Sequence, residues 1–129
     1  MTEVIGFNRR SERREKVSLA VRIISDKGNE IRAETLDISK AGAAIVCHTV
    51  DRNELTPRGD FIEQGKPLEL SLFVIFPDKQ ACAGELKIHC RVVYSRRIAE
   101  SECQLGLRFI SMASEAQEYL DLFMQSMRV

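Results

Sequence analysis

The fold class follows from Val17-Ser18-Leu19-Ala20-Val21-Arg22-Ile23, in which large apolar residues occupy every second position. Successive side chains of a β-strand point to opposite faces of a sheet, so this period places the apolar residues on one face. The stretch is followed by Asp26-Lys27-Gly28-Asn29, a Gly-containing turn of hairpin type. We therefore predict a strand over residues 17–23 that leads directly into an antiparallel partner.

The same period of two returns along most of the chain, over residues 31–38, 42–47, 68–76, 86–94 and 103–109. Residues 48–66 are polar and contain Pro57, Gly59 and Gly65, so we expect a long connection with a turn of helix there. About six strands with one solvated face each predict an all-β fold. An antiparallel barrel or a strongly curled sheet satisfies this pattern, because closure removes exposed strand edges.

The last segment has helical spacing instead. Its apolar residues are Met112, Ala116, Tyr119, Leu120, Phe123, Met124 and Met127. They predict an amphipathic α-helix over residues 112–128, with Ser114 and Gln117 as a capping box. We expect the apolar stripe to cover an open end or side of the barrel, with an oligomer contact as the alternative.

The composition indicates one domain without net charge, since 129 residues contain 19 Lys and Arg against 19 Asp and Glu. This balance argues against a general nucleic-acid coat or a polybasic membrane binder, because both need excess positive charge. No secretory signal or membrane-spanning apolar run is present, so we expect a cytoplasmic protein. The cysteines Cys47, Cys82, Cys90 and Cys103 form no C-x-x-C pair and are expected to be reduced.

Neither a metal site nor an enzyme is predicted. The pairs Cys47-His48 and His89-Cys90 contain zinc-ligand residue types, but neighbouring strand residues face opposite sides. Cys90 is therefore expected in the core and His89 on the outside. The phosphate-binding, zinc-protease and nucleophile-elbow motifs are absent from the sequence, and no cofactor is expected.

The densest charge feature is Asn8-Arg9-Arg10-Ser11-Glu12-Arg13-Arg14, immediately before the first predicted strand. We expect this stretch to be an arm rather than a strand, within a flexible arm over residues 1–16. A guanidinium group is a planar fork of donors that fits two acceptors at once, such as guanine O6 and N7 or phosphate oxygens. The alternative is a solvated N-terminus that binds nothing.

A second polar feature is Asp37-Ile38-Ser39-Lys40-Ala41-Gly42, where the second strand ends. Asp37 and Ser39 stand two residues apart and are predicted to point to the same side. A carboxylate accepts hydrogen bonds and a hydroxyl both gives and accepts, which suits the N–H groups of a purine. Gly42 would allow a close approach or a positive φ. The alternative is a turn that only bends the chain.

Taken in order, R-x-x-x-R before a strand and D-x-S-x-x-G at the end of the next strand resemble the PilZ-domain family of bacterial cyclic diguanylate (c-di-GMP) receptors. The similarity extends over about residues 8–110, through residues 17–23, 65–70, 90–94 and 105–109. It implies a six-stranded antiparallel β-barrel with a C-terminal helix, over residues 17–129, that binds c-di-GMP on its outside.

The arginine spacing fits two registers, Arg9 with Arg13 or Arg10 with Arg14. In the family the second arginine stands three residues before the first apolar strand position, and Arg14 meets this relative to Val17. The resemblance therefore assigns guanine and phosphate contacts to Arg10 and Arg14. Arg9 precedes the motif, at a position where family members differ in binding one ligand or a stacked pair.

The resemblance further implies that Asp37 and Ser39 bind the guanine and that Gly42 provides clearance. The expected protein is a non-enzymatic c-di-GMP receptor whose arm becomes ordered over the ligand and signals to an unidentified partner protein. Binding to DNA, RNA or a membrane is not expected. A homodimer is one of the possible oligomeric states. One alternative is an adaptor of the same barrel that acts without nucleotide. Another is a small barrel for single-stranded nucleic acid, which the absence of Trp and the few Tyr disfavour.

Overall fold

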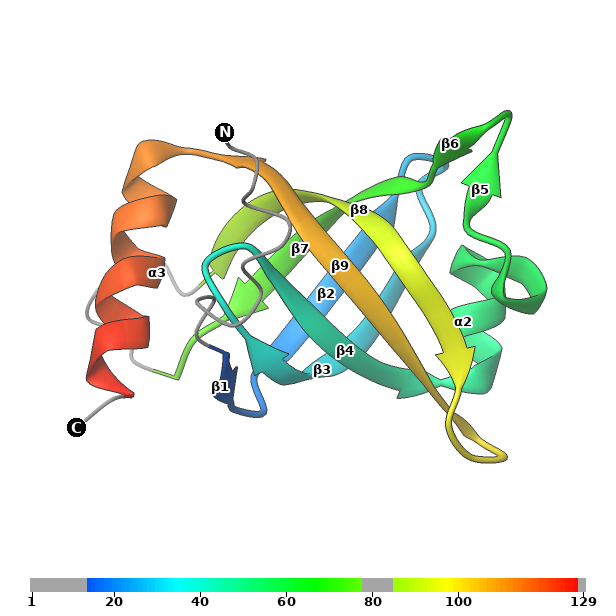
Figure 1. The fold of residues 1–129 in the computed structure, drawn as a ribbon, viewed down its shortest axis with the longest axis horizontal. Helices are drawn as coiled ribbons and strands as arrows, with labels where there is room; N and C mark the ends of the chain where they lie inside the picture. The colour runs from blue at the N-terminus through cyan, green and yellow to red at the C-terminus, as the bar shows by residue number, and fades with distance from the viewer. Residues whose placement is uncertain (1–13, 78–84, 128–129) are drawn as a thin grey trace, which may run out of the picture.

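A computed structural model describes residues 14–77 and 85–127 of the chain. Six long strands close into an antiparallel barrel, because β4 pairs with β9 on one side and with β3 on the other (Figure 1). The strands are β2 (Ala20–Ser25), β3 (Glu30–Ile38), β4 (Gly42–His48), β7 (Glu69–Ile75), β8 (Glu85–Arg97) and β9 (Glu102–Met112). The predicted all-β barrel is confirmed.

The alternating apolar residues form the barrel core, as predicted. Val21 and Ile23 of β2 are buried opposite Val74 and Leu72 of β7. Full burial of such a side chain contributes about 1.5–3 kcal/mol relative to leaving it exposed. The turn that joins β2 to β3 is the predicted hairpin, and Gly28 adopts a φ of +90° there, which a side chain would resist.

The long polar connection contains more structure than the sequence predicted. Helix α2 (Thr49–Leu55) is capped by His48, whose Nδ1 accepts a hydrogen bond from the Val50 N–H at 3.1 Å. A 3₁₀ turn, η2 (Pro57–Gly59), follows. The small hairpin of β5 (Ile62–Glu63) and β6 (Lys66–Pro67) was not predicted, because two-residue strands are too short to show alternation.

Helix α3 (Ser114–Ser126) lies within the predicted range, but the predicted capping box is wrong. The N-cap residue is Ala113, which has no side chain that can cap, and Ser114 is already helical. The Gln117 side chain instead donates to Asp121 Oδ1 at 3.4 Å, one turn along the helix. Met112, which fits the helical spacing, ends β9.

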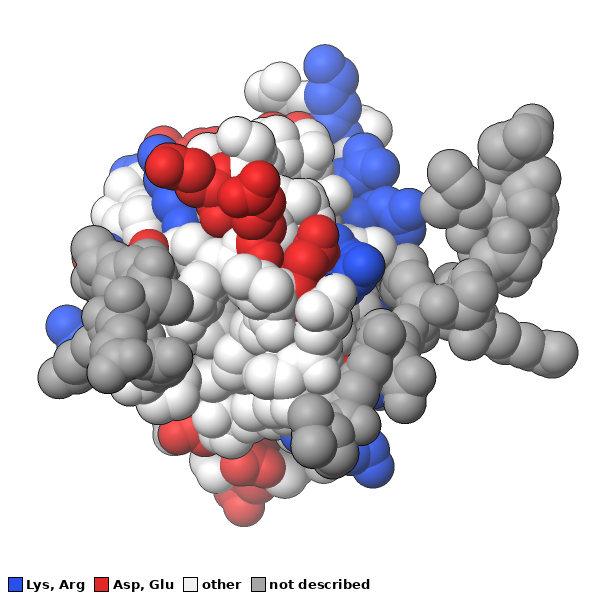
Figure 2. Space-filling view, turned by 90° about the vertical axis from the view of Figure 1, so that its left-hand side faces the viewer, with Lys and Arg blue, Asp and Glu red and all other residues white. Residues whose placement is uncertain are grey.

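The apolar face of α3 covers one end of the barrel, as expected (Figure 1). Leu120 and Met124 are buried in the same core as the strand residues. The rings of Tyr119 and Phe123 meet Phe76 edge-on, with ring centroids 4.9 and 4.6 Å from it. The outward face of the helix carries acidic side chains (Figure 2).

The last two residues of the arm expected over residues 1–16 belong to a strand, whereas residues 1–13 lie outside the described residues. Glu15 and Lys16 form a short strand, β1 (Glu15–Lys16), opposite Ile38 and Asp37 of β3. The physical reason lies in β3, which is longer than its neighbour β2 and pairs with it only as far as Glu34. The backbone of β3 beyond that point needs hydrogen-bond partners, and β1 provides them.

Candidate functional site

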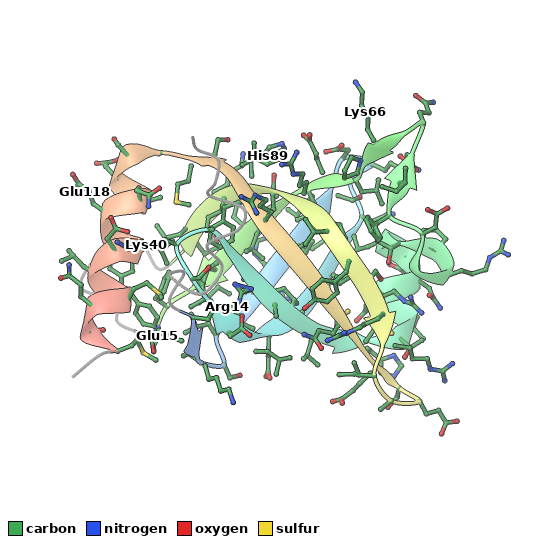
Figure 3. The ribbon with its side chains drawn as sticks, viewed as in Figure 1. Arg14, Glu15, Lys40, Lys66, His89 and Glu118 are labelled. Carbon is green, nitrogen blue, oxygen red and sulfur yellow. The ribbon has the colours of Figure 1, made fainter. Side chains whose placement is uncertain are left out.

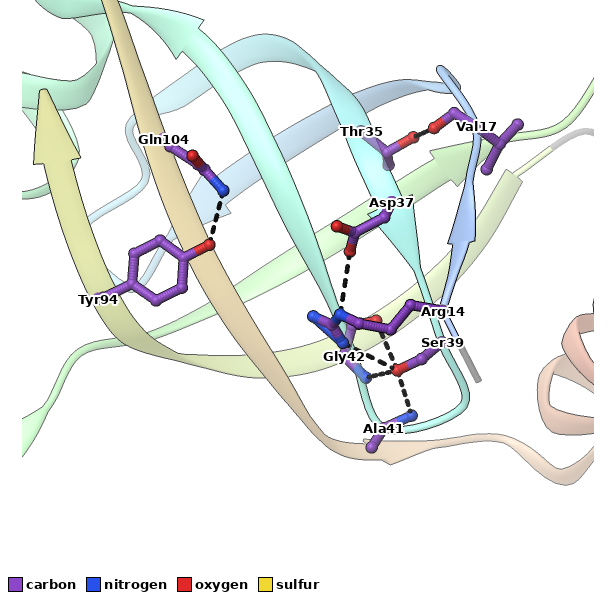
Figure 4. Close-up of polar contacts among 9 residues, drawn as sticks. All are labelled: Arg14, Val17, Thr35, Asp37, Ser39, Ala41, Gly42, Tyr94 and Gln104. Carbon is purple, nitrogen blue, oxygen red and sulfur yellow. Dashed lines mark hydrogen bonds and ion pairs between the residues drawn. The ribbon is translucent and has the colours of Figure 1, made fainter. Parts of the chain in front are cut away.

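The pairing of β1 with β3 brings Arg14 to the outer wall of the barrel, next to two other predicted site residues. Arg14 Nε lies 3.3 Å from Asp37 Oδ1, and Arg14 Nη1 donates to Ser39 Oγ at 3.3 Å (Figure 4). The Arg14 side chain is 42% exposed and that of Asp37 26%. Ion pairs at such partly exposed positions are weak, so a ligand can displace them at small cost.

Asp37 has unused capacity to accept hydrogen bonds. Its Oδ1 atom is buried and accepts no hydrogen bond from the described residues, although Arg14 lies within ion-pair distance of it. Buried polar atoms in native proteins nearly always have a partner, so an unsatisfied carboxylate oxygen is a place for an incoming N–H group. The alternation around Asp37 is interrupted by a β-bulge between Thr35 and Asp37.

Ser39 is fully buried and holds the turn that follows β3. Its Oγ accepts from the N–H groups of Ala41 at 3.2 Å and Gly42 at 3.1 Å, and it donates to the Gly42 carbonyl at 3.2 Å. A hydroxyl has two lone pairs and one hydrogen, so the turn alone uses all of them. The Arg14 contact is a further one, and it is the contact that a ligand can replace. Ser39 therefore has a structural role in this turn, and its expected contact with a guanine stays a prediction.

Gly42 is required by the neighbouring strand. A Cβ atom at this position would lie 2.3 Å from the Leu107 carbonyl oxygen on β9. The φ of Gly42 is not positive, so the suggested left-handed conformation does not occur. The close neighbour of Gly42 in the structure is the backbone of β9, and the expected clearance for a ligand stays a prediction.

The structure therefore brings Arg14, Asp37, Ser39 and Gly42 together at one place on the barrel wall (Figure 4). Arg9 and Arg10 lie outside the described residues. Lys40, at the tip of the turn, reaches helix α3, where its Nζ lies 3.9 Å from Asp121 Oδ1 (Figure 3).

Sequence reasoning missed an aromatic residue beside the site. Asp37 is opposite Ala44, Ala44 is opposite Gly106, and Gly106 is opposite Tyr94, so the four form one row across the barrel wall. The Tyr94 ring lies over Gly106, where a Cβ would meet it at 2.1 Å. Two small residues thus separate the carboxylate from an aromatic side chain.

Simple alternation groups Tyr94 with the inward Ile88, Cys90 and Val92, but the structure turns it outward. The reason is a β-bulge between Val92 and Tyr94, which shifts the register by one residue. Outside the core, Tyr94 Oη accepts from Gln104 Nε2 at 2.8 Å, and the Arg96 guanidinium lies 5.0 Å from the ring centroid. The sequence carries no signal for this bulge, so the outward position of Tyr94 could not be predicted from it.

The cysteine and histidine residues lie as the alternation predicted. Cys90 is buried, and His89 lies on the outer wall with Nε2 2.7 Å from Glu69 Oε1. Burial raises the pKa of the Cys47 and Cys90 thiols to about 12. Within residues 14–77 and 85–127, no three His, Cys, Asp or Glu side chains are grouped so that they could hold a metal ion. Among the described helices, none has the length and apolar character needed to span a bilayer.

Fold and site together define a small closed β-barrel with an arginine–aspartate site on its outer wall and a helix across one end. A family model for the PilZ domain matches residues 8–126. The chain belongs to the PilZ domain family. Among curated protein sequences, none matches this chain.

Solved structures show the same fold. The PilZ domain of YcgR from Escherichia coli, solved with c-di-GMP, is 12% identical with a TM-score of 0.62, covering 93% of this chain and 92% of that one. The MrkH–c-di-GMP complex of K. pneumonia is 20% identical with a TM-score of 0.63, covering 93% of this chain and 55% of that one. The inhibitor of motility MotI/DgrA of Bacillus subtilis is 21% identical with a TM-score of 0.63, covering 89% and 48%. The chain thus spans about half the length of MotI and MrkH.

Proposed function

We propose that this chain is a receptor for c-di-GMP. The observation that carries the proposal is the contact of the Arg14 guanidinium with Asp37 and Ser39 on the outer barrel wall. Two structural neighbours were solved with c-di-GMP, which supports the same ligand class here. The proposed role is that of a non-enzymatic, cytoplasmic sensor.

The proposed binding step is an exchange of partners. Without ligand, Arg14 contacts Asp37 and Ser39 at 3.3 Å each. After Arg14 moves away, a guanine offers N–H donors to Asp37 Oδ1, which accepts no hydrogen bond from the described residues, and offers O6 and N7 to the released guanidinium fork. Arg10 then binds a second guanine edge or a phosphate, and Arg9 adds contacts next to it. Ser39 and Gly42 shape the turn on which the ligand rests.

Signalling is proposed to run through the arginine-rich arm. Arg9 and Arg10 precede Arg14 by five and four residues in the sequence, and Arg14 lies at the site immediately before β1. A doubly anionic ligand neutralises these guanidinium groups, which otherwise repel one another, and thereby favours an ordered arm. A partner protein then recognises the ordered form. Amide exchange of residues 8–16 tests this step: we expect slower exchange with ligand, and equal exchange in both states contradicts it.

Calorimetry with purified protein and c-di-GMP tests the binding proposal. Charge-assisted hydrogen bonds contribute about 1.5–3 kcal/mol each, so Arg14→Ala, Arg10→Ala and Asp37→Ala are each expected to weaken binding about tenfold or more. Arg32→Ala is the matched control, because Arg32 is exposed on β3 away from the site row. Absence of binding by the unmodified protein, or equal affinity of all variants, refutes the proposal.

A further inference from the structure

Two arginines, Arg91 and Arg108, stand side by side on the outer wall of the barrel. Arg91 of β8 is directly opposite Arg108 of β9, and both residues are exposed. Like charges directly opposite each other in an antiparallel pair destabilise a sheet. Their juxtaposition therefore needs a compensating partner.

No such partner is found within residues 14–77 and 85–127, where neither guanidinium makes an ion pair or a hydrogen bond. Glu69 is opposite Arg91 on the other side, but it forms no ion pair with Arg91, and its Oε1 lies 2.7 Å from His89 Nε2. The nearest acidic residue in the register thus leaves both arginines uncompensated.

A second arginine pair on the same barrel shows what compensation looks like. Arg22 of β2 is directly opposite Arg32 of β3. There, Arg22 Nε lies 2.8 Å from Glu85 Oε2 and Nη1 lies 3.2 Å from Glu30 Oε2. In this second pair, one arginine is thus held by two carboxylates of the chain, whereas neither Arg91 nor Arg108 forms an ion pair with the described residues.

The uncompensated pair adjoins the candidate site. Arg108 is directly opposite Gly42, the last residue of the turn that Ser39 holds. Adjacent strands are about 4.8 Å apart, so Arg108 and Arg91 lie about one and two strand spacings from Gly42. Gly42, Arg108 and Arg91 thus form a cross-strand row. This row lies beside the row described above, which runs from Asp37 to Tyr94.

We propose that Arg91 and Arg108 form a phosphate subsite for the ligand bound at Asp37 and Arg14. The inference rests on the proposed function and extends it to strands β8 and β9. A phosphodiester carries a negative charge that no pH change near neutrality removes, and its oxygens fit the guanidinium fork. Binding it relieves the repulsion between the two arginines, so the subsite contributes only when ligand is present.

Calorimetry at two salt concentrations tests the subsite. Arg91→Gln and Arg108→Gln are each expected to weaken c-di-GMP binding about tenfold and to make it less sensitive to salt, because a phosphate contact is lost. Arg32→Gln removes the same charge from the other arginine pair and is expected to leave affinity unchanged. Thermal unfolding without ligand should show Arg91→Gln and Arg108→Gln melting about 1–4 °C higher than the unmodified protein.

The outcomes separate the subsite from the proposed function. If the unmodified protein does not bind c-di-GMP, the proposed function fails and the subsite with it. If it binds, and Asp37→Ala abolishes binding while both glutamine variants bind normally, only the subsite is overturned. Weaker binding with unchanged salt sensitivity also overturns it, since the arginines then contact a guanine.

Discussion

Gly42 and Gly106 on the outer wall differ in what a methyl group would meet. At Gly42 the obstacle is the Leu107 carbonyl oxygen at 2.3 Å, which belongs to a paired strand and cannot move alone. At Gly106 the obstacle is the Tyr94 ring at 2.1 Å, which ends a side chain that can rotate away. A Gly→Ala substitution therefore tests the close approach of the β4 and β9 backbones at Gly42 and the position of the Tyr94 ring at Gly106.

We predict that Gly42→Ala destabilises the protein by about 1–3 kcal/mol, because strands β4 and β9 must separate to admit the Cβ atom. Gly106→Ala is expected to have a smaller effect, since only the Tyr94 ring has to leave its position. Urea unfolding of the two variants measures the difference. A larger loss at Gly106 than at Gly42 would contradict this account.

The buried thiols of Cys47 and Cys90 give a pH-dependent prediction. Their pKa is about 12 in the folded protein, against an ordinary value of 9.0. Unfolded thiols ionise first as the pH rises, so this contribution to stability is complete below pH 9 and is lost between pH 9 and 12. We expect the free energy of unfolding to fall over this window, less steeply in Cys90→Ala.

Alkylation followed by mass spectrometry checks the same burial at neutral pH. Because the thiolate is the reactive form, Cys47 and Cys90 should react only after unfolding. Modification of Cys90 in the native protein at pH 7 would show that the thiol is reachable. Cys82 lies outside the described residues.

At the scale of elements, α3 depends on the barrel for its stability. A helix of this length is marginal alone in water, and here Leu120 enters the strand core while Leu122 faces outward at 63% exposure. We predict that Leu120→Ala destabilises the protein by about 2–5 kcal/mol and that Leu122→Ala changes it by less than about 0.5 kcal/mol. Thermal unfolding of both variants provides the measurement. Equal losses of stability in the two variants would contradict the packing of the Leu120 face of α3 on the barrel.

The long elements could be predicted because each repeats its period several times. What could not be predicted depends on single residues. The bulge after Val92 reverses the side to which Tyr94 points, and alternation carries no signal for an inserted residue. Likewise β1 forms because β3 extends beyond the end of its pairing with β2. The relative lengths of paired strands are known only once the sheet is assembled.

The sequence indicated which residues form the candidate site, but it did not indicate most of the contacts that these residues make. The spacing of Asp37, Ser39 and Gly42 indicated a polar turn at a strand end, and the structure places Arg14 against it. Two contacts could not be predicted. The Ser39 hydroxyl forms its hydrogen bonds within the turn, and Gly42 lies against the β9 backbone, which is far away in the sequence. The Arg91 and Arg108 pair is visible only once strand register is known.

At the scale of the whole molecule, ligand binding is expected to stabilise the folded state. A ligand at about 100 times its dissociation constant contributes about 2.7 kcal/mol, which raises the melting temperature by several degrees. We predict this rise with c-di-GMP for the unmodified protein and its loss in Asp37→Ala. A rise of equal size in both proteins would place the ligand away from the proposed site.

Barrel closure has a consequence for how other proteins can recognise this domain. Each of the six long strands has a neighbour on both sides, so their backbone hydrogen-bonding groups face one another along the wall. Among the described strands, unpaired edges are limited to the two-residue strands and to the ends of β8 and β9 that extend past their partners. Along the paired part of the wall, a docking protein must therefore discriminate by side-chain shape and charge, so surface substitutions that leave the backbone intact can map its footprint there.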